Sequence, residues 1–306
     1  MKKNVLITGG TGLIGRRLTE MLLERGYLVS YLSRSEDKTY PGVSVYYWDI
    51  KKEAVDPRAL DSMDYLIHLA GAGIADERWT EARKKVLIDS RTESIALLAR
   101  IMKAQGQRPE AFVSSSAVGY YGGDTGDEKK TEQSAPGDDF LAEVTVKWEA
   151  AADLVKDLDV RTVKLRTGVV LSDKSGALPK IAAPARFGLG APLGDGDQWM
   201  SWIHIDDMCR LYIEALENER WEGVYNGVAS LPVTNAELTK LISKVLDRPQ
   251  WIPKVPAFAL DLAFGEMAEV VLGSSYVENA RLRTMDFEYK FPVLEGALRD
   301  LLLKKP

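Results

Sequence analysis

A glycine-rich turn near the start of the chain has the residue types of a phosphate-binding site. It reads TGGTGLIG over residues 8–15 and joins an apolar run to a stretch with helical spacing. The glycines at 9, 12 and 15 would, in that order, permit a tight turn, let backbone amides approach a pyrophosphate, and let the helix pack on the strand. The free backbone N–H groups at the start of the following helix favour a negatively charged group there. Nucleotide contacts are predicted from Gly9, Thr11, Gly12, Leu13, Ile14 and Gly15.

The end of the second apolar run indicates which nucleotide this is. An NAD site carries an acidic residue about 20 residues further on, bonded to the ribose 2′-hydroxyl. Here Ser33, Arg34 and Ser35 occupy that place, and the nearest acids, Glu36 and Asp37, come later. A guanidinium flanked by hydroxyls suits a 2′-phosphate. The sequence therefore predicts NADP(H), with Ser33 and Arg34 as contacts; the alternative is a solvated surface arginine.

Short apolar runs alternate with helical patterns through the first 170 residues. Strands are predicted at 5–8, 28–32, 43–48, 65–69, 111–115 and 162–166, and helices beginning near Leu13, Ala59, Glu81 and Asp139. This βα alternation predicts an α/β fold with a Rossmann-type doubly wound parallel sheet.

The second half of the chain differs from the first in its residue composition. Residues 172–200 are rich in Gly, Pro and Ala and predict long loops with one helix. Helices at 206–217, 235–246 and 294–303 and a strand at 223–228 are expected beyond them. We expect an NADP-binding domain over 1–170, joined by the strand near 224–228, a substrate-binding part over 171–248, and a small C-terminal module over 249–306.

Composition argues against several functions. The net charge of the 306 residues is −5 and basic residues form no block, which disfavours nucleic acid and anionic membranes as partners. Cys209 is the only cysteine, and the two histidines are far apart, so no metal site is expected. No apolar run approaches the roughly 18 residues of a membrane span. We expect a soluble cytoplasmic protein.

Several stretches resemble extended short-chain dehydrogenases/reductases, the nucleotide-sugar epimerase and dehydratase group. TGGTGLIG is similar to their TGxxGxxG turn, and the resemblance covers about residues 1–245. It implies that Asp49 lies near the adenine, that Leu69, Ala70 and Gly71 flank the cofactor, and that Ser116 is the catalytic serine. SSSAVGYYG and GLGAPLGDGDQWMSWIHIDD resemble an atypical branch called epimerase family proteins, which adds a C-terminal domain of unknown function.

The usual catalytic pair of that group is missing. In the wider family a Tyr and a Lys lie at i and i+4 of one helix, where the cation lowers the pKa of the phenol for proton transfer. The matching helix here places Phe140 or Leu141 at the Tyr position and Val144 or Thr145 at the Lys position. Glu143 and Lys147 are expected to form only an exposed ion pair.

Other side chains could supply part of the chemistry. Ser116, Tyr120 and Tyr121 are predicted catalytic residues, because the tyrosines follow a strand end near the expected nicotinamide. An equally supported alternative is that the tyrosines only line the pocket or pack in the interior. Arg166 could contact an acidic ligand or form a buried ion pair.

At three further places a structural role is favoured over a functional one. His68 is expected in the core or against the cofactor, Trp79 in packing, and Asp206 or Asp207 at a helix N-cap.

Two functions remain open at this point. The first is an NADP(H)-dependent reductase or epimerase acting on a small polar or sugar-nucleotide-like substrate. The second is a regulator or scaffold that binds NADP(H) without turnover, which would explain the absent pair. The resemblance also implies a homodimer formed through helices beside the sheet.

Overall fold

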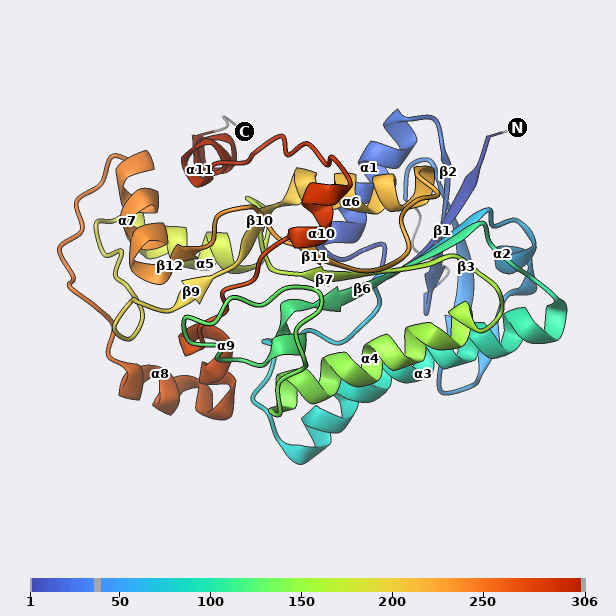
Figure 1. Ribbon diagram of the computed structural model, residues 1–306, viewed down its shortest axis with the longest axis horizontal. Coiled ribbons are helices and arrows are strands. Elements are labelled where there is room, and N and C mark those ends of the chain that lie inside the picture. Colours follow the sequence, from blue (N-terminus) through green and yellow to red (C-terminus); the bar gives the residue numbers. More distant parts are fainter. Residues whose placement is uncertain (1, 36–39, 304–306) are drawn as a thin grey trace.

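A parallel sheet covered by helices on both faces forms the centre of the molecule (Figure 1). The computed structural model describes residues 2–35 and 40–303. The strand order is β11-β7-β6-β5-β1-β2-β3-β4, and only β4 is antiparallel to its neighbour. Strand bounds are β1 Asn4–Thr8, β2 Leu28–Ser33, β3 Val43–Asp49, β4 Ala54–Val55, β5 Tyr65–His68, β6 Ala111–Ala117, β7 Thr162–Thr167 and β11 Gly223–Gly227. The predicted Rossmann-type fold is confirmed.

The order of the strands creates a place for a ligand. The chain runs outward from β1 through β2 and β3, then returns to place β5 on the other side of β1. In such sheets the crevice lies outside the carboxyl ends of the strands, where the order reverses. That point lies between β1 and β5, which pair in parallel from Val5–Tyr65 to Thr8–His68.

Long helices cover both faces. Helices α3 (Glu81–Gln105) and α4 (Phe140–Lys156) lie side by side on one face, and α1 (Leu13–Glu24) packs with α6 (Ile205–Glu217) on the other (Figure 1). The short α2 (Pro57–Asp61) precedes β5. Because both faces are covered, β1 reads as a continuous apolar run and is fully buried.

The start of α4 follows the expected capping chemistry, and the start of α6 departs from it. Asp139 accepts a hydrogen bond from the Ala142 amide at 2.9 Å and begins α4 as predicted. At α6 the N-cap is His204, whose Nδ1 accepts from the Asp206 amide at 3.0 Å. The predicted N-cap at Asp206 or Asp207 is therefore wrong. An imidazole nitrogen serves as the acceptor here, and both carboxylates fall in the first turn.

Much of the chain after β7 gathers at one end of the molecule, whereas α6 and β11 stay with the large sheet (Figure 1). Two small sheets pair β8 with β10 and β9 with β12. Their strands and the remaining helices are β8 Val169–Leu171, α5 Ala177–Ala185, β9 Trp199–Met200, β10 Trp202–His204, β12 Val233–Thr234, α7 Asn235–Val245, α8 Ala257–Phe264, α9 Glu269–Leu272, α10 Ala280–Thr284 and α11 Leu294–Leu303. The small strands were not predicted, because two or three residues carry no readable alternation.

The C-terminal segment returns to the main body. Asp207 accepts hydrogen bonds from the backbone amides of Lys290 and Phe291 at 2.7 and 2.8 Å. Leu294 and Leu298 of α11 belong to the same buried cluster as Val5 of β1. The proposed domain limits stay a prediction. Among the described residues, no helix has the length and apolarity to cross a membrane, and no group of three or more acidic, histidine or cysteine side chains could hold a metal ion.

Candidate functional site

The glycine turn brings three backbone segments into contact at the reversal point. Gly9 has φ +70°, and a Cβ there would lie 2.7 Å from the carbonyl carbon of Leu69. A Cβ on Gly15 would lie 2.6 Å from the Cα of Gly10. Both positions therefore require glycine, because any side chain would separate β1, α1 and the segment after β5.

The start of α1 leaves donors for a ligand. Gly12 is its N-cap, and no side chain caps the helix. The amide of Ala70 donates to Thr8 Oγ1 at 3.3 Å and that of Leu69 to the Thr8 carbonyl at 3.0 Å, so the segment Leu69–Gly71 lies beside the turn. Uncapped amides, glycines that admit close approach and the adjoining segment fit a dinucleotide phosphate.

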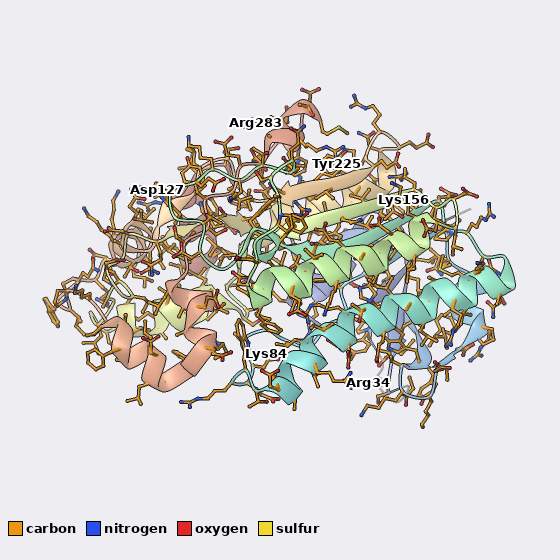
Figure 2. All side chains as sticks on the ribbon, turned by 60° about the horizontal axis from the view of Figure 1, so that its bottom comes forward. Arg34, Lys84, Asp127, Lys156, Tyr225 and Arg283 are labelled. Atoms are coloured by element: carbon orange, nitrogen blue, oxygen red, sulfur yellow. The ribbon has the colours of Figure 1, made fainter. Side chains whose placement is uncertain are left out.

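The end of β2 carries the side chains predicted to select NADP(H). Ser33 Oγ accepts from the Ser35 amide at 3.2 Å, which bends the chain after the strand. Arg34 is exposed at the periphery of the molecule (Figure 2) and makes no hydrogen bond or ion pair with any residue that the structure describes. Glu36 and Asp37 lie outside the described residues.

Asp49 ends β3, two strands away from β1. Its carboxylate accepts from the Lys52 amide at 3.2 Å and from the Tyr47 hydroxyl at 3.3 Å. The backbone hydrogen bond from Lys52 lowers the pKa of Asp49 below its usual value. An ionised acceptor thus lies at the same edge of the sheet as Ser33.

A buried ion pair lies where β6 and β7 end. Arg166 donates from Nε and Nη2 to the two carboxylate oxygens of Glu149 at 2.7 and 2.9 Å. Ser116 Oγ donates to the same carboxylate at 2.7 Å. Of the two readings of Arg166, the structure therefore shows the buried ion pair.

The two tyrosines after β6 contact that guanidinium from different sides. They belong to the 3-10 turn η1 (Val118–Tyr121). Arg166 Nη1 donates to the Tyr121 hydroxyl at 2.9 Å, and this hydroxyl donates to Asn226 Oδ1 at 2.7 Å. Burial raises the pKa of Tyr121 to about 12. The ring of Tyr120, which is partly exposed, stacks on Arg166 with its centroid 3.3 Å from Cζ. Catalytic roles for Ser116, Tyr120 and Tyr121 stay predictions.

The face of α4 that meets η1 carries no Tyr and no Lys. A Cβ on Gly119 would lie 3.4 Å from Leu141 Cβ and 3.6 Å from Thr145 Oγ1, so these two residues face η1. Glu143 and Lys147 form an ion pair of 2.5 Å with both side chains about half exposed, as predicted.

His68 and Trp79 are core residues. His68 is fully buried, and its Nε2 lies 2.8 Å from Ser94 Oγ. Burial, with the charge of Arg91, lowers the pKa of His68 to about 3. Trp79 is buried and donates to the Ile74 carbonyl at 2.9 Å, which confirms the packing reading.

Sequence reasoning missed three buried polar residues: Glu149, Asn226 and Arg91. One signal for Glu149 was available, because it follows Ala142 and Thr145 along a helical stripe whose other members are small or apolar. A charged residue on such a stripe predicts a buried partner.

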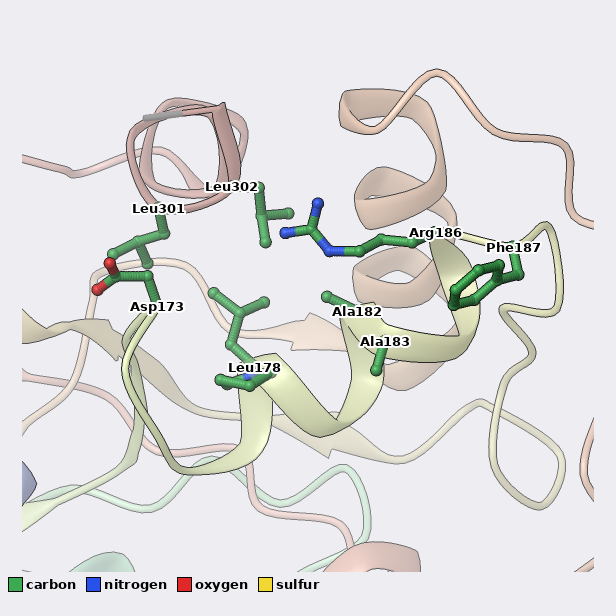
Figure 3. A pocket seen from close by; sticks show the side chains of 9 residues that line it. Asp173, Leu178, Ala182, Ala183, Arg186, Phe187, Leu301 and Leu302 are labelled. Atoms are coloured by element: carbon green, nitrogen blue, oxygen red, sulfur yellow. The ribbon is translucent and has the colours of Figure 1, made fainter. Parts of the chain in front are cut away.

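A pocket elsewhere in the molecule contains none of the predicted site residues. It lies between α5 and α11, with Leu178, Ala182 and Leu302 among its walls and Arg186 reaching across it (Figure 3).

Comparisons with known proteins agree with this geometry. Residues 5–226 match the NAD dependent epimerase/dehydratase family, and residues 255–301 match a domain of unknown function, DUF1731. Epimerase family protein YfhF of Bacillus subtilis is 36% identical over 98% of each chain. The crystal structure of human epimerase family protein SDR39U1 (isoform 2) with NADPH has a TM-score of 0.88 and 36% identity, covering 99% of this chain and 100% of that one.

A second solved structure is similar over the whole length of this chain. A nucleoside-diphosphate sugar epimerase from Corynebacterium glutamicum has a TM-score of 0.80 at 34% identity. The match covers 99% of this chain and 58% of that protein. The resemblance identified from the sequence is thus confirmed, and the chain belongs to the NAD dependent epimerase/dehydratase family.

Proposed function

We propose that the protein is an NADP(H)-dependent oxidoreductase or epimerase of the extended short-chain dehydrogenase/reductase type. Its substrate is a small polar or sugar-nucleotide-like molecule. The glycine turn carries this proposal, because Gly9 and Gly15 are packed too closely for any side chain at the point where the strand order reverses. The human relative crystallised with NADPH supports the choice of cofactor.

Each part of the cofactor has a set of residues that would hold it. The diphosphate lies against the amides of the turn, Gly9, Thr11, Gly12, Leu13, Ile14 and Gly15. Arg34 and Ser33 hold the 2′-phosphate, and Asp49 lies near the adenine. Leu69, Ala70 and Gly71 flank the dinucleotide on the β5 side.

The chemistry then depends on the ends of β6 and β7. Bound nicotinamide supplies or accepts a hydride. Ser116 donates its hydroxyl hydrogen to Glu149, so its oxygen accepts a hydrogen bond from a substrate hydroxyl. Tyr120 is held in place by Arg166, and its partly exposed hydroxyl donates to the substrate oxygen.

A regulator that binds NADP(H) without turnover is the second candidate. The observation that favours it is the pair Leu141 and Thr145 on the face of α4 toward η1. Neither side chain can supply the cation and phenol that the wider family uses.

Calorimetric titration tests the cofactor. We expect NADPH to bind more tightly than NADH, and Arg34→Ala to weaken NADPH more than NADH because only NADPH carries the 2′-phosphate. Arg108→Ala, an exposed arginine that pairs with Asp159, is the control and should change neither. Equal losses for both nucleotides in Arg34→Ala would contradict the 2′-phosphate contact, and no heat from NADPH or NADP+ would refute the cofactor itself.

Turnover separates the two candidates. The protein is incubated with NADPH or NADP+ and a panel of carbonyl, alcohol and nucleotide-sugar compounds, with absorbance and product chromatography as readouts. Turnover that falls at least 100-fold in Ser116→Ala or Tyr120→Phe, with NADPH affinity unchanged, supports the enzyme. Tight NADPH binding without turnover across the panel supports the regulator.

A further inference from the structure

Arg91 is a buried guanidinium without an acidic partner. It lies on α3 with 9% of its surface exposed. Its Nη1 donates to the Leu87 carbonyl at 2.8 Å and its Nη2 to the Ala72 carbonyl at 2.9 Å. The guanidinium stacks on the ring of Trp148 of α4 at 4.9 Å. Within residues 2–35 and 40–303, no carboxylate forms an ion pair with it.

Further polar atoms around this side chain are also unsatisfied. Arg91 Nε, Trp148 Nε1 and His68 Nδ1 are buried without a hydrogen-bond partner among the described residues. Burial, with the nearby charge of Arg83, lowers the pKa of Arg91 to about 10, so the group is still charged at neutral pH. A buried charge normally has a counter-charge, because removing an unpaired ion from water is costly.

The charge lies directly behind the segment that flanks the proposed cofactor. A Cβ on Gly71 would lie 3.1 Å from Arg91 Cζ, so the guanidinium packs on the backbone of Gly71. The same segment meets the glycine turn, since a Cβ on Gly9 would strike Leu69 at 2.7 Å. Gly71 thus joins Arg91 to the segment that lies beside the turn, where the diphosphate is proposed to bind.

We propose that Arg91 is a positioning residue for the cofactor, whose anionic diphosphate supplies the counter-charge that the protein itself does not provide. The inference rests on the proposed function. Arg91 acts from behind Leu69–Gly71 and so complements the turn, whose amides supply hydrogen bonds but no formal charge.

Two substitutions separate charge from hydrogen bonding. Arg91→Gln keeps a donor for the Ala72 carbonyl and removes the charge, whereas Arg91→Lys keeps the charge and loses the forked geometry. We expect Arg91→Gln to weaken NADPH and NADH by the same factor, roughly tenfold, because both share the diphosphate. Arg91→Lys should stay within about threefold of the parent protein.

Matched controls define the result. Arg100→Gln removes an arginine from the exposed side of α3, where it pairs with Glu53, and should leave both affinities unchanged. Arg34→Ala should instead discriminate between the two nucleotides. Calorimetric titration gives the affinities, and circular dichroism and thermal melting show that each variant is folded.

Distinct outcomes would overturn the proposal. If Arg91→Gln binds NADPH and NADH as tightly as the parent protein, the charge of Arg91 has no role in cofactor binding. A tenfold loss in a normally melting Arg91→Lys shows that hydrogen-bond geometry, not charge, is what matters, and this arm decides the case if Arg91→Gln does not fold. A parent protein that binds neither nucleotide instead refutes the proposed function.

Discussion

Arg166 and Glu149 form a two-point ion pair that links β7 to α4 at the carboxyl edge of the sheet. Its two hydrogen bonds measure 2.7 and 2.9 Å, and the side chains are 4% and 8% exposed. The same carboxylate holds Ser116, and the same guanidinium holds Tyr121. The predicted catalytic residues thus share one buried network, and its energetics can be tested residue by residue.

Breaking this pair should cost much more than breaking the exposed pair on the same helix. Glu149→Ala leaves Arg166 buried and unpaired, so we expect a loss of about 3–5 kcal/mol in the free energy of unfolding. Glu143→Ala breaks the half-exposed pair with Lys147 and should cost at most about 0.5 kcal/mol. Urea denaturation monitored by circular dichroism measures both. Similar losses in the two variants would show that the buried pair is not a stabilising link.

The two neighbouring tyrosines should behave differently when their hydroxyls are removed. Tyr121→Phe leaves Asn226 Oδ1 and one donor of Arg166 without their partner, so we expect a loss of about 1–3 kcal/mol in stability. Tyr120→Phe keeps the ring on Arg166 and should change stability by less than about 0.5 kcal/mol. Thermal and urea unfolding provide the comparison. The reverse order would mean that the Tyr121 hydroxyl is not a structural bridge.

Two helical glycines form a matched pair. Gly15→Ala places a Cβ 2.6 Å from Gly10 Cα, so the variant should lose NADPH binding and stability together. Gly296 lies in α11 with open space at the same position, so Gly296→Ala should stabilise the protein by about 0.5–1 kcal/mol. Melting temperature and NADPH titration are the readouts. Normal NADPH affinity in Gly15→Ala would contradict the close packing of the turn.

The buried histidine makes stability depend on pH in a defined window. The pKa of His68 falls from 6.5 to about 3 on folding, mainly through burial. Between these values the unfolded chain binds a proton that the native protein does not, so stability falls as pH falls. We expect the contribution of His68 to the free energy of unfolding to fall by about 1 kcal/mol between pH 7 and pH 5.5.

Urea denaturation at a series of pH values measures this slope. His68→Gln should flatten it while keeping a donor toward Ser94 Oγ. His204, whose pKa burial also lowers, remains as the second histidine and contributes its own slope in the same direction. An unchanged slope in His68→Gln would show that this side chain titrates alike in both states.

Sequence periodicity was sufficient for the main elements of the fold. The six parallel strands of the large sheet before residue 170 were predicted to within two residues at each end, because a strand buried on both faces must be apolar along its length, whereas the two-residue β4 was not predicted. Helices were predicted to begin near Glu81 and Asp139, and α3 and α4 do begin there, with the side chains of Thr80 and Asp139 as their caps. The start of α6 was predicted to within one residue, but its N-cap was not, because the acceptor is a histidine, which capping preferences do not include.

The buried polar network could not be derived in the same way. Glu149 and Arg166 are separated by 17 residues and lie on different elements, and nothing local in the chain indicates that their side chains meet. Arg91 looked like an ordinary helical arginine until the fold placed it against Gly71 and Trp148. For the same reason, the choice between a ligand contact and an ion pair at Arg166 was left open until the structure was known.

The sequence by itself determined the glycine turn, the order of the main strands and helices and the family resemblance, because each depends on residue types at short spacing along the chain; on the same basis it predicts that the Tyr–Lys pair is absent. Tertiary structure alone decided which buried charges are paired: Arg166 has a carboxylate partner, and Arg91 has none among the described residues. Pairing depends on distances between side chains that the packing of the helices on the sheet brings together, and no local pattern encodes those distances.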